Sequence, residues 1–158
     1  MLIQAGEYAP NFTLMDETKA LRSLSDYRGK PVVLYFYPKD DTPGCTKEAC
    51  SFRDDYSQYE EAGVEILGVS PDSAKSHTKF IEKFDLPFTL LADTDHAMSQ
   101  AYGVWGPKKM MGREYDGIYR TTFLIGPDGR ILKVFENVKP ANHSAEILAA
   151  LEGITKNE

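Results

Sequence analysis

The chain alternates short apolar runs with longer amphipathic stretches. Val32 to Tyr37 is an unbroken run of β-branched, aliphatic and aromatic residues, which is typical of a buried strand. Val64 to Val69 is a second run of this kind, and the segment TKEACSFRDDYSQYEEAG between the two predicts one helix that ends at Gly63. A strand, a helix and a second strand in this order predict a right-handed parallel unit.

The rest of the chain continues the alternation of strands and helices. Phe80, Ile81 and Phe84 form an apolar face at helical spacing, which predicts a helix from Asp72 or Ser73 to about Phe84. Ahead of the first apolar run we expect a hairpin of Ala9–Leu14 with Ala20–Arg22 and a short helical or turn segment over Ser23–Gly29, capped by Ser23 or Ser25. After the helix that ends near Phe84 we expect a strand at Pro87–Leu91, a helix at Thr94–Tyr102, and a surface loop or irregular hairpin over Gly103–Gly117 that could act as a lid. The last expected elements are two strands at Thr121–Ile125 and Arg130–Phe135, joined by the turn Pro127-Asp128-Gly129, and a helix at Asn142–Leu151 that ends before Gly153. This order predicts one α/β domain over residues 1–158, with a mixed central sheet and helices on both faces.

Composition narrows the class of protein. The chain has 158 residues, of which 42% are hydrophobic and 27% charged, as is ordinary for a soluble globular domain. Its net charge of −6 argues against a nucleic-acid-binding surface. The sequence has neither a signal-peptide pattern nor an apolar run long enough to span a membrane, so we expect a cytoplasmic protein. The three histidines have no helical pairing in the sequence, which favours surface or capping roles over metal binding: His77, His96 and His143.

The polar loop after the first apolar run leads to the first of two cysteines. Thr42 is suited to cap the helix, and the ring of Pro43 fixes φ at a value that suits a first helical turn. Cys45 is therefore expected at a helix N-terminus, just beyond the carboxyl end of a strand. The helix dipole and the free backbone N–H groups there favour an anion, and so favour the nucleophilic thiolate over the thiol. The alternative interpretation is that Cys45 is a small buried hydrophobe.

The second cysteine, Cys50, follows five residues later. On an intact α-helix, two residues at this spacing have Cα atoms roughly 8–9 Å apart, whereas a disulfide requires about 4.4–6.8 Å. A disulfide between Cys45 and Cys50 would therefore require the first turns of the helix to unwind. The spacing also differs from that of the C-x-x-C exchangers and of four-ligand zinc sites.

The segment around the first cysteine resembles a known family. Pro38, Thr42 and Cys45 match the P-x-x-x-T-x-x-C signature of the peroxiredoxins, and the longer string FYPKDDTPGCTKEAC is similar to the Q-type subgroup, also called bacterioferritin comigratory protein. The resemblance continues through APNFTL, YGVWGPKKMMG and YRTTFLIGPDGRI to the C-terminal helix. It implies a thioredoxin-like fold with peroxiredoxin elaborations, and a thiol peroxidase that needs no metal or other cofactor.

The resemblance also implies a role for each matching residue. Cys45 would be the peroxidatic cysteine, which a peroxide oxidises to a sulfenic acid, and Cys50 would resolve this acid as an intramolecular disulfide. Arg120, which directly precedes a predicted strand, would hold the peroxide together with Thr42, and Pro38 would shield the sulfur from solvent. The implied substrates are hydrogen peroxide and organic hydroperoxides, and the implied reductant is thioredoxin or glutaredoxin. Because resolution stays within one chain, a monomer is the simplest expectation.

Two other classes of protein share parts of this pattern. A thioredoxin-type thiol–disulfide oxidoreductase would reduce disulfides without peroxide, but the cysteine spacing and the segment Tyr119–Thr122, where thioredoxin has a proline, count against it. A non-catalytic redox sensor or holdase would react with peroxide slowly and stoichiometrically.

Four charged side chains close to the cysteines in the sequence are not assigned to the site. Asp40 and Asp41 are expected to point to solvent. Glu48 and Arg53 lie on the predicted helix, where they can pair locally.

Overall fold

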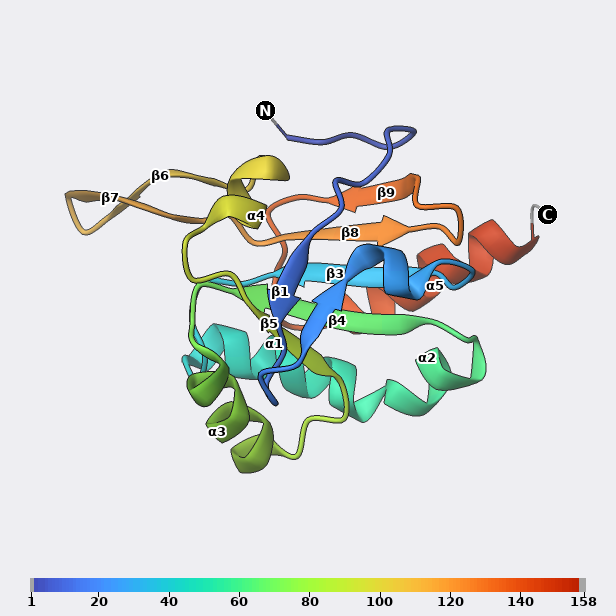
Figure 1. Ribbon diagram of the computed structural model, residues 1–158, viewed down its shortest axis with the longest axis horizontal. Helices are drawn as coiled ribbons and strands as arrows, with labels where there is room; N and C mark the ends of the chain where they lie inside the picture. Colours follow the sequence, from blue (N-terminus) through green and yellow to red (C-terminus); the bar gives the residue numbers. More distant parts are fainter. Residues whose placement is uncertain (1, 157–158) are drawn as a thin grey trace.

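A seven-stranded sheet with the order β2-β1-β5-β4-β3-β8-β9 forms the centre of the computed structural model, which describes residues 2–156. A separate hairpin, β6–β7, projects from one end of the molecule (Figure 1). The strands are β1 (Thr13–Met15), β2 (Leu21–Ser23), β3 (Val32–Phe36), β4 (Glu65–Ser70), β5 (Thr89–Ala92), β6 (Trp105–Met110), β7 (Arg113–Ile118), β8 (Thr121–Ile125) and β9 (Ile131–Phe135). The helices are the 3-10 helix η1 (Leu24–Tyr27) and the α-helices α1 (Pro43–Asp54), α2 (Tyr56–Glu61), α3 (Ala74–Phe84), α4 (Ala97–Ala101) and α5 (His143–Lys156).

The sheet is mixed, as the sequence predicts. β3, β4 and β5 run parallel to one another, whereas β8 runs antiparallel to β3 and β9 antiparallel to β8. Because β8 is antiparallel to β3, its first residue, Thr121, lies opposite the last residue of β3, Phe36. Arg120 directly precedes Thr121. Arg120 therefore lies beside the end of β3, where the loop that leads to Cys45 begins.

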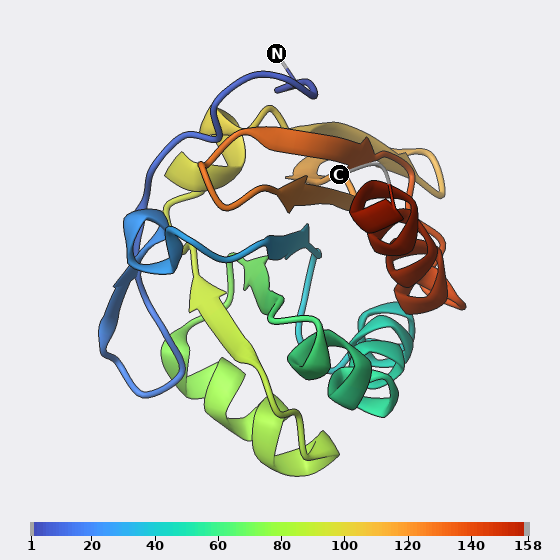
Figure 2. The ribbon, with the colours of Figure 1, turned by 90° about the vertical axis from the view of Figure 1, so that its right-hand side faces the viewer.

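The two faces of β3 divide the hydrophobic core. Side chains alternate between the faces of a strand, so successive residues of β3 join different clusters. One face packs against α1, α2, α3 and α5, and the other packs against η1 and α4. Figure 2 shows α5 in red and α1 with α2 in teal to green on the same side of the sheet, with α4 in yellow on the other. The cysteine-bearing helix is thus supported by the larger helical layer.

Three helices differ from the sequence prediction, and the shortest of them, α4, begins at Ala97 rather than at Thr94. The single helix expected to end at Gly63 is broken at Asp55, which is both the C-cap of α1 and the N-cap of α2. The Asp55 carboxylate accepts a hydrogen bond from Ser144 Oγ at 2.8 Å, and this bond ties the break to α5. Helix α5 continues through Gly153 to Lys156, because a glycine inside a helix costs only about 1 kcal/mol.

The Gly103–Gly117 segment forms a regular hairpin. β6 pairs with β7 from Trp105 opposite Ile118 to Met110 opposite Arg113. The two-residue turn between them, Met111-Gly112, has positive φ at both positions, as a type I′ turn requires. At the base of the hairpin the Trp105 ring stacks on His96, with ring centroids 3.8 Å apart. The proposed action of the β6–β7 hairpin as a lid stays a prediction.

Residues ahead of β1 lie along the outer side of β9. The backbone N–H of Gly6 donates to Ile131 O at 2.8 Å, and the N–H of Ile131 donates to Glu7 O at 2.9 Å. Tyr8 and Arg130 continue this pairing as an antiparallel bridge. The N-terminal segment thereby satisfies backbone groups that β8 does not reach. Within residues 2–156, no helix has the length and apolar character needed to cross a membrane.

Candidate active site

Cys45 lies in the first turn of α1, at the place the sequence predicts. Cys45 is only 1% exposed to solvent. Thr42 occupies the N-cap position with extended backbone, but its hydroxyl donates to Lys39 O at 2.9 Å and caps no helix N–H. Among the described residues no acceptor receives the backbone N–H of Cys45, which is one of the N-terminal donors that a helix cannot satisfy internally. The turn therefore offers this donor close to the sulfur.

The guanidinium of Arg120 joins Cys45 to a buried carboxylate. Nη2 of Arg120 donates to Cys45 Sγ at 3.1 Å, and Nη1 donates to Glu48 Oε1 at 3.1 Å. The Arg120 side chain is 21% exposed and that of Glu48 is 1% exposed. A cation at this distance in a largely dry site stabilises a negative charge on the sulfur. The prediction that Arg120 neighbours the Cys45 loop is confirmed.

Gly44 makes room for this contact. A Cβ atom at residue 44 would lie 2.8 Å from Arg120 Nη2, closer than real Cβ contacts allow. The absence of a side chain here lets the guanidinium reach the sulfur across the helix start. A larger residue at this position would displace Arg120 from Cys45.

Glu48 is the residue of this site that the sequence analysis left out. It pairs with Arg120 rather than locally with Arg53, which instead pairs with Asp54 and donates to Phe84 O. Burial raises the pKa of Glu48 to about 7, although Arg120 acts to lower it. Its second oxygen, Oε2, is buried without a hydrogen-bond partner. Glu48 thus holds Arg120 in place with a carboxyl that titrates near neutrality.

Glu48→Gln is expected to remove a pH-dependent cost of folding. Because its pKa is about 7 in the folded protein against 4.5 for an unperturbed glutamate, the folded state binds more protons than the unfolded state between these values. The free energy of unfolding therefore falls as pH rises through this window, by about 3 kcal/mol in total. Urea unfolding of the reduced proteins measures this effect. Between pH 4.5 and pH 8, the free energy of unfolding of the variant relative to that of the wild type should rise by this amount. The exposed Glu82→Gln should show no such gain, and parallel curves for Glu48→Gln would contradict the expectation.

A second cation lies close to Cys45 and Arg120. Lys108, on β6, is half-buried, and its Nζ donates to Ile118 O at 2.8 Å, two residues before Arg120. Burial lowers the pKa of Lys108, the Arg120 cation lowers it further, and Cys45 acts in the opposite direction. The β6–β7 hairpin therefore contributes to the electrostatics around the sulfur. A lysine in a segment predicted as a surface loop or irregular hairpin carries no sequence signal for such a place.

Cys50 lies on the same helix as Cys45. Both thiols are free, and Cys50 is half-buried. Because α1 is continuous from Pro43 to Asp54, the two residues keep the helical spacing that is too long for a disulfide. Pro38 is half-buried between β3 and the loop. Its shielding of the sulfur stays a prediction.

Three other expectations about polar side chains are wrong. Asp40 does not point to solvent but is buried, where Tyr37 and Ser76 donate to its carboxylate and His77 Nδ1 lies 2.7 Å from it. His77 and His143 are likewise buried, 0% and 2% exposed, rather than at the surface.

The partners of these residues explain their burial. His143 lies between Thr122 Oγ1, 2.8 Å from its Nε2, and Glu146 Oε1, 2.9 Å from its Nδ1. Burial lowers the pKa of His143. Asp41 does lie at the surface, where it pairs with Lys83. In the described part of the chain, no cluster of three or more His, Cys, Asp or Glu side chains is placed to hold a metal ion.

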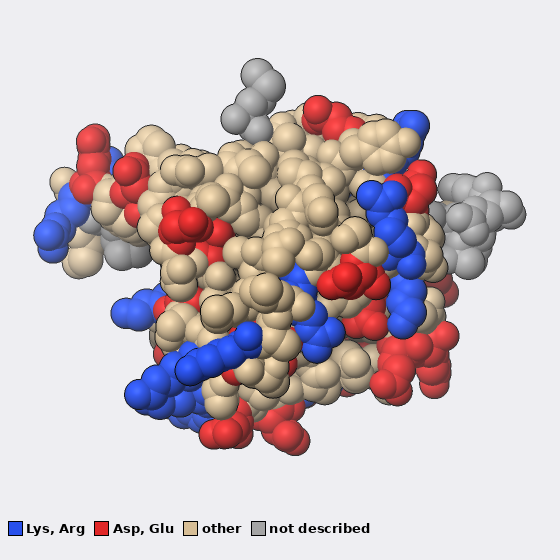
Figure 3. All heavy atoms as spheres, viewed as in Figure 1, with Lys and Arg blue, Asp and Glu red and all other residues tan. Residues whose placement is uncertain are grey.

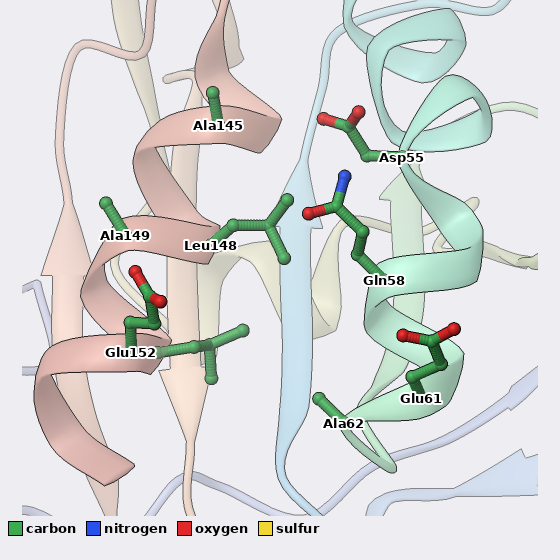
Figure 4. Close-up of a pocket in the computed structure, with 9 residues that line it drawn as sticks. Asp55, Gln58, Glu61, Ala62, Ala145, Leu148, Ala149 and Glu152 are labelled. Atoms are coloured by element: carbon green, nitrogen blue, oxygen red, sulfur yellow. The ribbon is translucent and has the colours of Figure 1, made fainter. Parts of the chain in front are cut away.

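One cleft lies away from these residues, between the α1–α2 junction and α5. It has a volume of about 710 Å³, and Gln58 and Leu148 approach each other across it from opposite helices (Figure 4). Its charged lining residues are the carboxylates Asp55, Glu61 and Glu152. It offers neither a thiol nor a cation. In the view of Figure 3, positive and negative side chains are interspersed over the body and the projecting hairpin.

Comparisons with known proteins give matches over most of the chain. The model of the AhpC/TSA family matches residues 5–134. Peroxiredoxin Bcp of Bacillus subtilis is 49% identical over 156 residues, which cover 99% of each chain, and peroxiredoxin Bcp of Escherichia coli is 46% identical over 146 residues, 92% of this chain and 94% of the relative.

Solved structures give the same result. A PrxQ mutant of Xylella fastidiosa has a TM-score of 0.91 at 36% identity and covers 98% of each chain. The bacterioferritin comigratory protein of Xanthomonas campestris, described for its alkyl peroxide reduction activity, has a TM-score of 0.87 at 37% identity and covers 97% of each chain.

Proposed function

Since the chain belongs to the AhpC/TSA family, and within it to the Bcp and peroxiredoxin Q subgroup of thiol peroxidases, we propose that Cys45 is its peroxidatic cysteine and Cys50 its resolving cysteine. The observation that supports this assignment most directly is the 3.1 Å contact between Arg120 Nη2 and Cys45 Sγ at the start of α1. Both the cation and the helix N-terminus favour a thiolate at this position.

The first step is attack of the Cys45 thiolate on one oxygen of a hydroperoxide. An S–O bond forms as the O–O bond breaks, and the leaving oxygen takes up a proton and departs as an alcohol, or as water when the substrate is hydrogen peroxide. Arg120 and the free N–H of Cys45 stabilise the charge that moves onto the oxygens. The Thr42 hydroxyl, which already donates to Lys39 O, accepts a hydrogen bond from the peroxide O–H. Pro38 keeps water away from the sulfur.

The second step forms a disulfide within the chain. The first turns of α1 unwind, the Cys50 thiolate attacks the sulfenic sulfur of Cys45, and the hydroxyl leaves as water. A dithiol such as thioredoxin then reduces the disulfide by exchange. All reacting groups come from one chain, so a monomer suffices. A reducing compartment such as the cytoplasm would keep both thiols ready.

The Xanthomonas campestris relative suggests the substrate class. That protein is described as reducing alkyl peroxides, and we extend the same class to this chain together with hydrogen peroxide. Steady-state rates with hydrogen peroxide and with alkyl hydroperoxides, each measured with thioredoxin and with glutaredoxin, would rank both the substrates and the reductants.

Cys50→Ser is expected to stop the cycle at the sulfenic acid. One equivalent of peroxide should still oxidise Cys45, and a sulfenic-acid trap should label it, while turnover with thioredoxin falls by about tenfold or more because no disulfide forms. In the oxidised wild type, trypsin cleavage at Lys47 should leave the two cysteine peptides joined only through their disulfide. Full thioredoxin-dependent turnover by Cys50→Ser would refute the resolving role.

A further inference from the structure

A buried polar cluster ties the Cys45 loop to α3, and the reaction steps described so far make no use of it. We call Tyr37, Asp40, Ser76 and His77 the loop anchor. Tyr37 Oη donates to Asp40 Oδ1 at 2.6 Å, and Ser76 Oγ and His77 Nδ1 lie 2.8 and 2.7 Å from Oδ2. The side chains of Asp40 and His77 are 3% and 0% exposed. A buried carboxylate is thus held by Tyr37, which directly follows β3, and by two residues of α3.

The hydrogen bonds of His77 join the loop to β5 as well as to α3. Its Nε2 lies 2.9 Å from Leu91 O, which can only accept, so Nε2 carries a hydrogen. Its Nδ1 lies 2.7 Å from Asp40 Oδ2, so a single hydrogen between the two groups completes this bond. Burial and the neighbouring Asp40 charge hold the pKa of Tyr37 well above its ordinary value, which keeps its hydroxyl as a donor. Three short hydrogen bonds in a dry site therefore fix the geometry of Asp40.

The anchor lies directly before the start of α1. Asp40 stands two residues before the N-cap Thr42, and its own backbone N–H donates to Asp72 Oδ2 at 2.8 Å. The next residue, Asp41, has φ +55°, the left-handed conformation that aspartate tolerates better than most residues. A residue held by backbone and side chain is thus followed at once by a sharp turn into the helix. Any shift of Asp40 is passed on to the first turn of α1.

We propose that Asp40 and His77 are positioning residues, which align Cys45 with Arg120 and mark the point at which unwinding of α1 stops. This inference rests on the proposed function, in which Cys45 is held in the helix for the peroxide and released to meet Cys50. A weakened anchor favours the unwound helix. It therefore slows attack on the peroxide and speeds closure of the disulfide, two effects of opposite direction.

The chain supplies a matched control for this inference. Asp41, on the same loop, pairs with Lys83 on the same helix α3 at 2.8 Å, but these side chains are 46% and 60% exposed. Exposed ion pairs contribute little to stability. Asp41→Asn removes that pair while keeping a residue that tolerates positive φ. Asp40→Ala removes the anchor carboxylate, and Asp40→Asn is the milder change because its amide can still donate to a neutral His77.

The first test is hydrogen exchange in the reduced full-length chain without peroxide. Exchange of the α1 amides over residues 43–54 should speed up by about tenfold in Asp40→Ala and less in Asp40→Asn, and should stay within about twofold of wild type in Asp41→Asn. Asp40→Ala combined with His77→Gln should exceed Asp40→Ala by no more than about twofold, because the two residues act as one unit. Unchanged exchange in both Asp40 variants, or equal acceleration in Asp41→Asn, would overturn the inference. This readout needs no catalysis, so it stands even if the roles of the cysteines are wrong.

The second test separates positioning from a general loss of structure. Single-turnover kinetics on variants that circular dichroism shows to be folded should give slower Cys45 oxidation and faster disulfide formation in Asp40→Asn and Asp40→Ala, each by about threefold to tenfold. If both rates fall together, the anchor serves stability alone and the inference fails. If wild-type Cys45 itself does not react with peroxide, the proposed function fails instead.

Discussion

Cys45→Ser is expected to abolish peroxide consumption, with a loss on the order of a thousandfold or more, because a serine hydroxyl stays protonated where a thiolate would attack. The fold should survive, since serine is close in size to cysteine and the residue lies at the start of α1. Peroxide consumption with thioredoxin in excess is the measurement, and circular dichroism checks folding.

The matched control for this variant is Cys50→Ser, which should still reduce one equivalent of peroxide. The contrast between the two variants separates the peroxidatic from the resolving cysteine. Full activity of Cys45→Ser would rule out the assignment. Slow, stoichiometric oxidation of the wild type would instead favour a redox sensor.

Arg120→Met is expected to slow oxidation of Cys45 by about a hundredfold to a thousandfold, the usual cost of removing a group that stabilises charge in a reaction. The change removes the donor 3.1 Å from Sγ and leaves the buried Glu48 carboxyl without its cation. The oxidation rate of Arg120→Lys should lie between those of the wild type and Arg120→Met, because an ammonium keeps the charge but cannot bridge sulfur and carboxylate as a planar guanidinium does. Stopped-flow oxidation of the reduced protein measures each rate.

Two further variants separate chemistry from stability in this experiment. Arg120→Met combined with Glu48→Gln removes the unpaired carboxyl, so it should recover stability lost by Arg120→Met without recovering the rate. Arg130→Met replaces an exposed arginine that is paired with Asp128. It should change neither the stability of the protein nor the rate of Cys45 oxidation. An Arg120→Met enzyme that retains more than about half of the wild-type rate would remove Arg120 from the mechanism.

The placement of Cys45 was predictable because its signals are local. An apolar run ends, Pro43 follows the N-cap residue, and the cysteine falls in the first turn. The approach of Arg120 depends on the antiparallel pairing of β3 with β8, whereas the hairpin signal near residue 128 predicts only the pairing of β8 with β9. The resemblance to a family, rather than any pattern within the chain, selected Arg120 from the six arginines.

The residues that sequence analysis misplaced are joined by contacts distant in sequence. Asp40 meets His77 across 37 positions, and Glu48 meets Arg120 across 72. The periodic pattern of apolar and polar residues does not identify the partner of a buried charged side chain. For Glu48 a signal did exist, because it shares the buried face of α1 with Cys45, Ala49 and Phe52. A carboxylate on an otherwise apolar helix face requires a buried partner.

The N-terminal residues that accompany β9 also bear on self-association. A sheet that ends in an uncovered strand invites another chain to extend it, and proteins block this by shortening or covering the terminal strands. Here β2 ends the sheet with three residues, and Gly6 and Glu7 occupy the backbone groups of Ile131 at the opposite margin. A chain truncated ahead of Tyr8 would expose that margin and become prone to intermolecular β-pairing and aggregation.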